Sequence, residues 1–180
     1  MNKIVIVAVV SFIMLVAIGC RQKEQEQEQK QQQVTYAPAA PPAQLEIDQM
    51  AQAAKMAPKN AHVWINLGNA LMDAQRFGEA IDAYGKALAL EPKNVPVLVD
   101  QGTCYRGVRQ FDKAVELYRR ALKIDPNFPN GHRNLGVVLA FDLHNKAEGI
   151  KEIKRYLELE PNGPDADSAR KALQELNSSK

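Results

Sequence analysis

The side chains that could act as nucleophiles or metal ligands are few in this sequence and lie far apart. The two cysteines are Cys20 and Cys104, and the three histidines are His62, His132 and His144. None of the histidines has a histidine or cysteine four positions away, the spacing that brings two zinc ligands to one face of a helix. Nothing close to Cys104 in the sequence supplies a base, so we expect an inert buried thiol there. These residues favour neither a metal site nor nucleophilic catalysis.

The acidic residues and the glycines also lack the arrangements that enzymes use. Gly68, Gly102 and Gly136 each stand alone inside a helical pattern, so they do not form a phosphate-binding loop. Acidic residues recur on what we expect to be the solvent-exposed side of helices and form no paired-carboxylate site; they include Glu79, Asp82, Asp112 and Glu116. We therefore predict a non-enzymatic protein without a metal or cofactor, whose function depends on a binding surface.

The composition is that of ordinary folded protein with balanced charge. Of the 180 residues, 46% are hydrophobic and 24% are charged, and the formal net charge is +2. The apolar content is sufficient for a core. No basic block with interleaved aromatic residues occurs, so the charge pattern does not indicate nucleic-acid binding.

The elements that must position any binding residues recur at a fixed interval of 34 residues. In residues 61–94 the recurring positions are Trp64, Leu67, Gly68, Leu71, Ala80, Tyr84, Ala87 and Pro92. Thirty-four residues later the chain has Leu98, Gln101, Gly102, Tyr105, Ala114, Tyr118, Ala121 and Pro126. Such self-similarity is the signature of a repeat array. Apolar residues at helical spacing predict two helices in each copy, joined by a turn at 75–78 and closed by the proline.

Small residues are expected where the two helices of a copy meet. We predict that Gly68 faces Ala80, because two small residues let the helix axes come close. A third copy over 129–162 holds one extra residue, which we place in the turn at 142–146. It also has Tyr156 where alanine is usual, so we expect its packing to differ.

This pattern resembles the tetratricopeptide repeat, which reads W-x2-L-G-x2-Y…A-x3-F…P over 34 residues. The first copy departs from that pattern at Leu71 and Tyr84, and the second departs at Leu98 and Gln101. The resemblance implies an all-α fold, a right-handed α-solenoid of about three helix hairpins with N- and C-terminal capping helices. It also implies a scaffold that binds other proteins.

The 34-residue offset and the changes in composition divide the chain into three parts. A lipoprotein-type signal peptide is expected at 1–20, and a Gln/Glu-rich and then Pro/Ala-rich tether at 21–43. The repeat domain is expected at 44–177. Its predicted parts are an N-terminal capping helix at 44–57, repeats at 61–94, 95–128 and 129–162, and a C-terminal capping helix at 164–177.

The first 20 residues indicate export and attachment to a membrane. Lys3 precedes an apolar run from Ile4 to Ile18, which suits a secretory signal and is short for a membrane-spanning helix. The following Gly19-Cys20 resembles the end of a bacterial lipobox, which implies that Cys20 is lipidated. Arg21 takes the place of the Asp that commonly keeps lipoproteins at the inner membrane, so an outer-membrane destination is favoured. An uncleaved N-terminal anchor is the alternative.

By the same resemblance, the first helix of each repeat lines a concave groove that binds a peptide or protein segment. The candidate groove residues at the matching positions are Asn66, Asn69, Arg106, Arg133, Asn134 and Phe141. Arg106 and Arg133 lie on adjacent first helices, where they could share one carboxylate bidentately. One family subset binds chaperone C-terminal carboxylates through Lys and Asn; here Asn69 is kept, but Ile65 and Asp100 replace that Lys and a second Asn. Asparagines are also common at such positions without marking a ligand.

We therefore expect a protein-interaction module at a bacterial envelope, facing the periplasm or the extracytoplasmic surface. Its partner would be a protein or peptide segment held in the groove. The alternative is a structural or assembly factor for an envelope complex that acts through its convex face or by self-association. The oligomeric state does not follow from the sequence pattern.

Overall fold

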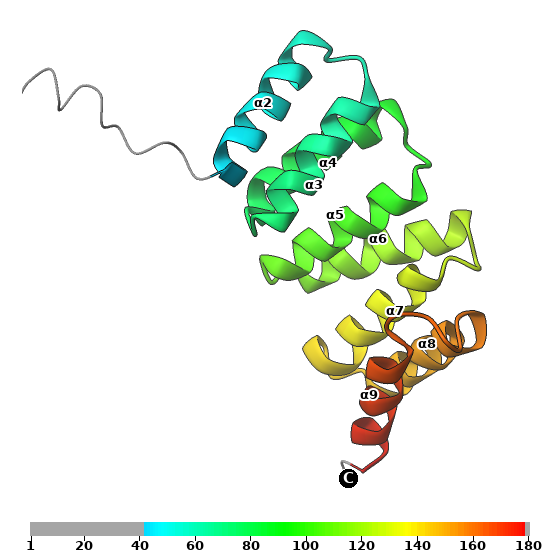
Figure 1. Cartoon of the computed structure of the whole chain (residues 1–180). Helices are drawn as coiled ribbons and strands as arrows, with labels where there is room; N and C mark the ends of the chain where they lie inside the picture. Colours follow the sequence, from blue (N-terminus) through cyan, green and yellow to red (C-terminus); the bar gives the residue numbers. More distant parts are fainter. Residues whose placement is uncertain (1–41, 179–180) are drawn as a thin grey trace, which may run out of the picture. The chain divides into compact units, whose positions relative to one another are not determined.

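The computed structural model describes residues 42–178, which contain helices and no strand. The all-α fold predicted from the sequence is confirmed for this part of the chain (Figure 1). The signal peptide predicted at 1–20, with Cys20, and nearly all of the tether predicted at 21–43 lie outside the described residues. Between 42 and 178, no helix is both long enough and apolar enough to span a bilayer.

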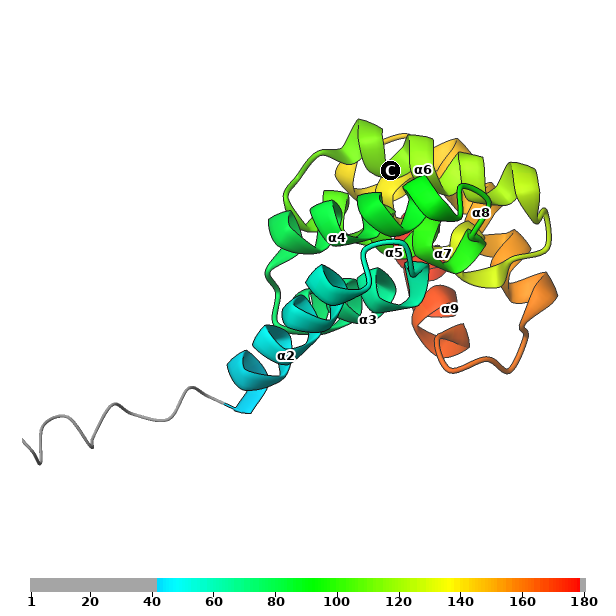
Figure 2. The same ribbon diagram turned by 90° about the horizontal axis from the view of Figure 1, so that it is seen from above.

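Three antiparallel helix pairs follow one another along the chain and stack side by side. The order is α2 (Pro42–Met56), α3 (Ala61–Asp73), α4 (Phe77–Leu90), α5 (Val95–Gly107), α6 (Phe111–Ile124), α7 (Pro129–Val137), η1 (Val138–Asp142), α8 (Lys146–Leu159) and α9 (Ala166–Ser178). The pairs are α3 with α4, α5 with α6, and α7 with α8. In Figure 2 the second helices α4, α6 and α8 lie along the outer arc of the stack, and the first helices α3, α5 and α7 lie along its inner side.

Short polar residues and left-handed turns set the limits of these helices. The side-chain oxygen of Asn60 accepts a hydrogen bond from the His62 amide, which caps the N-terminus of α3. The turns within the three pairs each contain one residue with positive φ: Gln75 at 58°, Arg109 at 62° and His144 at 57°. Because these residues occupy equivalent places, the same local geometry reverses the chain in all three repeats.

Buried tyrosine rings pack over the seam glycines of the first two pairs. A β-carbon built on Gly68 would lie 2.5 Å from Cε1 of Tyr84, so the ring occupies the space above this glycine. Gly102 and Tyr118 have the same relationship, with a separation of 2.6 Å. Tyr84, one turn beyond Ala80, therefore supplies the atoms nearest to this glycine, and the approach of Gly68 to Ala80 stays a prediction.

The third pair packs differently, as its sequence indicates. Ile153 stands where the earlier pairs have the buried tyrosine, and Gly149 stands where they have alanine. A β-carbon on Gly136 would lie 3.0 Å from the carbonyl oxygen of Gly149, so here two glycines do allow a close backbone approach. Tyr156 is 1% exposed and belongs to a separate apolar cluster with Ile153 and residues of α9.

The extra residue of the third copy widens the end of a helix instead of lengthening the following turn. Residues Val138–Asp142 form a π-helical turn, in which the Leu143 amide donates to the carbonyl oxygen of Val138 at 3.0 Å. At the equivalent place in the second copy the Val108 amide donates to Cys104, four residues back. A π turn inserts one residue into a helix without breaking it. The predicted position in the turn at 142–146 was therefore too far along the chain.

A capping helix covers each end of the stack. On α2, Ile47 and Ala54 are buried and join the main apolar cluster, which extends through the repeats to Leu139. On α9, Ala169 and Leu176 are buried against the cluster of the third pair. Terminal helices of this kind cover an apolar face that the last repeat would otherwise expose to water.

Candidate binding groove

The first helices form the wall of one hollow, which we call the inner groove. Its volume is about 400 Å³, and its lining comes from α3 (Met72), α5 (Val99, Asp100, Thr103 and Arg106), α6 (Tyr118) and α7 (Asn130, Arg133, Asn134 and Val137). The helical repeat produces this arrangement, because equivalent positions of successive first helices face the same side. Among the predicted groove residues, Arg106, Arg133 and Asn134 line the inner groove together.

The other predicted groove residues lie elsewhere or have a structural contact. Asn66 is exposed on α3 but does not line the inner groove. Asn69 accepts a hydrogen bond from the hydroxyl of buried Tyr84 at 2.7 Å. Phe141 lies in η1, packs against the apolar cluster of the third pair, and borders a separate hollow of about 280 Å³ together with Leu176 of α9. The insertion of the π turn moves Phe141 away from the register of the earlier first helices.

A chain of polar contacts links the groove wall to the buried tyrosines. The Thr103 hydroxyl lies 3.3 Å from the hydroxyl of Tyr118 and is also 3.0 Å from the carbonyl oxygen of Val99. The Asn134 amide donates to the Thr103 oxygen at 3.2 Å, which joins α7 to α5. Burial raises the pKa of Tyr118 to about 12, so its hydroxyl stays protonated and available as a donor. These bonds hold the groove wall in one arrangement.

The two groove arginines are paired with carboxylates of their own chain. Nε of Arg106 lies 2.6 Å from Oδ2 of Asp142, which is the last residue of the π turn. Nη1 of Arg133 lies 3.1 Å from Oδ1 of Asp165, which precedes α9. The carboxylate that they could share is that of a bound partner, so this stays a prediction; within the chain each guanidinium group has its own carboxylate. Neither aspartate was identified from the sequence, because both lie more than 30 residues away from the arginine that they contact.

Asp100 is the acidic residue of the inner groove, and its carboxylate is half-buried. Within residues 42–178 it takes part in no hydrogen bond or ion pair. Loss of hydration raises its pKa from 3.8 to about 6, and the negative charge of Asp73 on α3 contributes in the same direction. The sequence singled out Asp100 only as a departure from a known binding pattern. Its burial and isolation depend on how α3, α5 and α7 pack.

The cysteine and histidine side chains form no catalytic group in this part of the chain. Cys104 is buried, and burial followed by the charge of Asp100 raises the pKa of its thiol to about 12. His62 and His144 are exposed. Across 42–178, no three His, Cys, Asp or Glu side chains lie close enough together to hold a metal ion.

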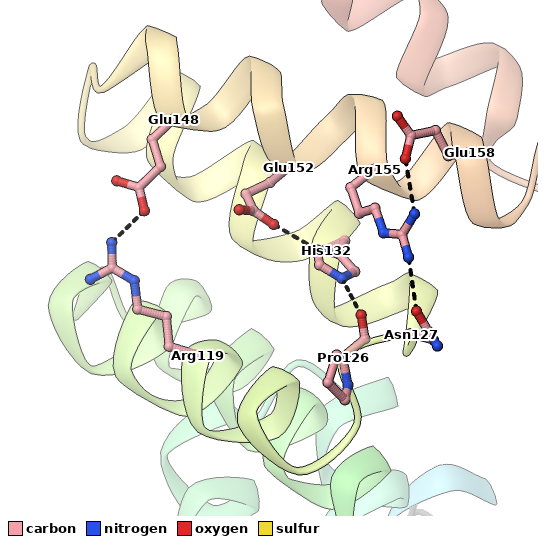
Figure 3. A network of polar contacts seen from close by, with 8 residues as sticks. All are labelled: Arg119, Pro126, Asn127, His132, Glu148, Glu152, Arg155 and Glu158. Atoms are coloured by element: carbon pink, nitrogen blue, oxygen red, sulfur yellow. Dashed lines mark hydrogen bonds and ion pairs between the residues drawn. The ribbon is translucent and has the colours of Figure 1, made fainter.

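His132 belongs to a polar network on the outer side, between α6 and α8 (Figure 3). Its Nδ1 lies 2.6 Å from Oε2 of Glu152, and its Nε2 lies 2.9 Å from the carbonyl oxygen of Pro126. Nearby, Arg119 on α6 forms an ion pair with Glu148 on α8 at 2.6 Å. The Arg119–Glu148 pair fastens the third helix pair to the second, whereas His132 joins α7 to α8 and to the loop that precedes α7.

Comparisons with known proteins agree with the 34-residue repeat found in the sequence. A model described as tetratricopeptide repeat matches residues 61–94, and one described as TPR repeat matches residues 110–140. The first of these ranges coincides with the first predicted copy. No protein of curated function matches the chain in sequence.

Several solved TPR structures have the same fold. The first TPR of Spaghetti (RPAP3), solved with the HSP90 peptide SRMEEVD, is 25% identical, with a TM-score of 0.61 over 66% of this chain and 91% of that chain. The Sgt2 TPR domain from Aspergillus fumigatus is 26% identical, with a TM-score of 0.60 over 65% and 76%. The Arabidopsis OM64 TPR domain is 22% identical, with a TM-score of 0.60 over 64% and 94%. This chain therefore contains tetratricopeptide repeats stacked as an all-α solenoid, the architecture of a non-enzymatic protein-interaction scaffold.

Proposed function

We propose that this protein is a TPR scaffold of the bacterial cell envelope that binds a protein or peptide segment in its inner groove. The observation that carries the proposal is the hollow of about 400 Å³ between α3, α5 and α7. It combines apolar side chains such as Val99 and Val137 with the amides of Asn130 and Asn134. An extended segment needs both, since its backbone requires hydrogen-bond partners and its side chains require apolar contacts.

A neighbouring structure supports this mode of binding. The RPAP3 domain, which has the same fold at 25% identity, is described with a peptide bound. The polar contacts that fix Thr103 and Asn134 hold the groove wall before any partner arrives. A wall that is already ordered loses less conformational entropy on binding, which favours affinity.

The groove can be tested with a pair of tryptophan variants of the full chain in detergent. Asn130→Trp adds bulk at an exposed position that borders the inner groove. Ala89→Trp adds the same side chain at an exposed position of α4, outside the groove. A phage library of random 12-residue peptides is selected on the unmodified protein, and selected peptides are then titrated against each variant.

We expect selected peptides to keep their affinity for Ala89→Trp and to lose about tenfold or more for Asn130→Trp, which is at least 1.4 kcal/mol. Equal affinity for both variants would place peptide binding outside the inner groove. A library that yields no binding peptide would contradict the proposed function itself.

Attachment to the envelope is the second part of the proposal. The sequence of residues 1–20 supports it, because an apolar run followed by Gly19-Cys20 resembles a lipobox. Several acyl chains on Cys20 would hold the protein stably at a bilayer, with the outer membrane favoured by Arg21. Mass spectrometry of membrane-extracted protein should find an acylated N-terminal Cys20, and a chain that still begins at Met1 would contradict lipidation.

Action as an assembly factor through the outer face is a second candidate. Leu90 and Ile124 occupy equivalent positions at the ends of α4 and α6, and they are 41% and 39% exposed. A recurring exposed apolar residue can contribute to an interface between copies. Sedimentation velocity should then detect an oligomer that depends on protein concentration and is lost in Leu90→Lys with Ile124→Lys.

A further inference from the structure

The uncompensated charge of the inner groove is negative. Asp100 lines the groove, and no cation of residues 42–178 forms an ion pair with it. A second carboxylate, Asp73 on α3, is near enough for its charge to act on Asp100. The Asp73 side chain is exposed at the end of α3, and it also forms no ion pair within residues 42–178.

The positive groups of the same groove are already neutralised. Arg106 is paired with Asp142 at 2.6 Å, and Arg133 is paired with Asp165 at 3.1 Å. An incoming carboxylate would therefore meet two arginines whose charge is already balanced by aspartates of the same chain, and it would approach Asp100 as a like charge.

We propose that the inner groove selects a protein segment that carries a lysine or arginine side chain, and that Asp100 forms the ion pair with it. The proposal rests on the function proposed above and names the chemistry of the partner. It separates this protein from the RPAP3 domain, whose described peptide SRMEEVD contains acidic residues at its end. In this chain Asp100 stands where the family pattern that binds chaperone carboxylates has an asparagine.

The energetic state of Asp100 supports this assignment. Its pKa is raised to about 6, so the carboxylate is ionised at neutral pH but is less stable in the folded protein than it would be in water. A cation from a partner would relieve that penalty on binding. Ionisable groups held in an unfavourable environment are concentrated at functional sites, because they gain most when the correct partner arrives.

Three matched sets of synthetic peptides test the charge preference. Peptides selected for binding are resynthesised with lysine, glutamate or glutamine at every charged position, while all other residues are kept. Each set is titrated against the full chain in detergent, against Asp100→Asn, and against the control Asp82→Asn. Asp82 lies exposed on α4, so its substitution removes one negative charge away from the groove.

We expect the lysine set to bind the unmodified chain and Asp82→Asn with equal affinity, and to bind Asp100→Asn about tenfold more weakly. The glutamine set should bind more weakly than the lysine set and should not respond to Asp100→Asn. Preference for the glutamate set, equal binding of all three sets, or an unchanged affinity of the lysine set for Asp100→Asn would each overturn the proposal.

The controls keep this proposal separate from the proposed function. If Asn130→Trp abolishes binding while peptide charge has no effect, the groove binds segments without charge selection, and only the present proposal fails. If no peptide depends on the groove, both proposals fail. Asp100→Asn preserves the size and shape of the side chain, so a loss of binding does not come from a cavity.

Discussion

The ring of Tyr84 occupies the space in which residue 68 would place a β-carbon, with its Cε1 2.5 Å from that position. The ring cannot move aside freely, because it is fully buried and its hydroxyl donates to Asn69 at 2.7 Å. The contact between Tyr118 and Gly102 repeats this relationship in the second pair. Glycine at these positions therefore sets the distance between the two helices of a repeat.

Gly68→Ala should lower the free energy of unfolding by about 1–3 kcal/mol, because the added methyl group overpacks the seam. Gly78→Ala is the matched control, since a β-carbon there has no neighbour within 4 Å. The control should be neutral or slightly stabilising, because alanine favours a helix over glycine. Urea unfolding followed by circular dichroism measures both; equal stability of the two variants would mean that the tyrosine ring can shift without cost.

Asp100→Asn should stabilise the protein at pH 7. The pKa of Asp100 rises from 3.8 in the unfolded chain to about 6 in the fold, so the folded state holds the proton more tightly. Stability is therefore lost as the pH rises from about 4 through 6, and asparagine removes this loss. The gain at pH 7 should be about 1–3 kcal/mol, and it should disappear below pH 4. Asp82→Asn, at an exposed position of α4, is the control for the removal of one negative charge in the same unfolding experiments.

Binding of a basic segment should weaken as the pH falls below about 6, because protonated Asp100 has lost the charge that attracts the partner. Titration of the lysine peptides at a series of pH values measures this effect. The affinity of Asp100→Asn should vary much less over the same range. A full-chain profile identical to that of the variant would show that another group carries the pH dependence.

Cys104 should be unreactive while the protein is folded. Its thiol is 0% exposed and its pKa is about 12, so both access and thiolate are lacking at neutral pH. In Cys20→Ala, which leaves Cys104 as the single thiol, a chromogenic disulfide reagent should react only after urea is added. Rapid reaction of the folded variant would mean that α5 opens readily from the stack.

The repeats could be read from the sequence because their signal is redundant. Residues such as Ala80, Ala114, Pro92 and Pro126 recur at one interval, and each recurrence independently supports the same helix pair. The capping helices followed from the same offset and from the apolar spacing that ends at Leu176. Fold class depends on such periodic patterns, and one displaced residue does not change it.

The details of the groove could not be predicted in the same way. The partners of Arg106 and Arg133 come from a π turn and from the loop before α9, and neither location is encoded in the 34-residue pattern. Asp142 and Asp165 are ordinary acidic residues until the chain is folded. The same holds for Asp100, whose pKa depends on burial between neighbouring helices. Periodicity predicts which side a residue faces, but not what lies opposite.

The π turn at Val138–Asp142 also limits how an array of this kind can grow. Duplication of residues 61–94 within the chain would add a helix pair in which a tyrosine again packs over a glycine. The added pair would also keep the 34-residue spacing of its neighbours. A duplicate of 129–162 would bring isoleucine to the seam and a second π turn, which shifts the register of the second helix by one residue within the pair. Regular repeats can therefore be added between the existing copies, whereas the third copy is suited only to the C-terminal end of the array.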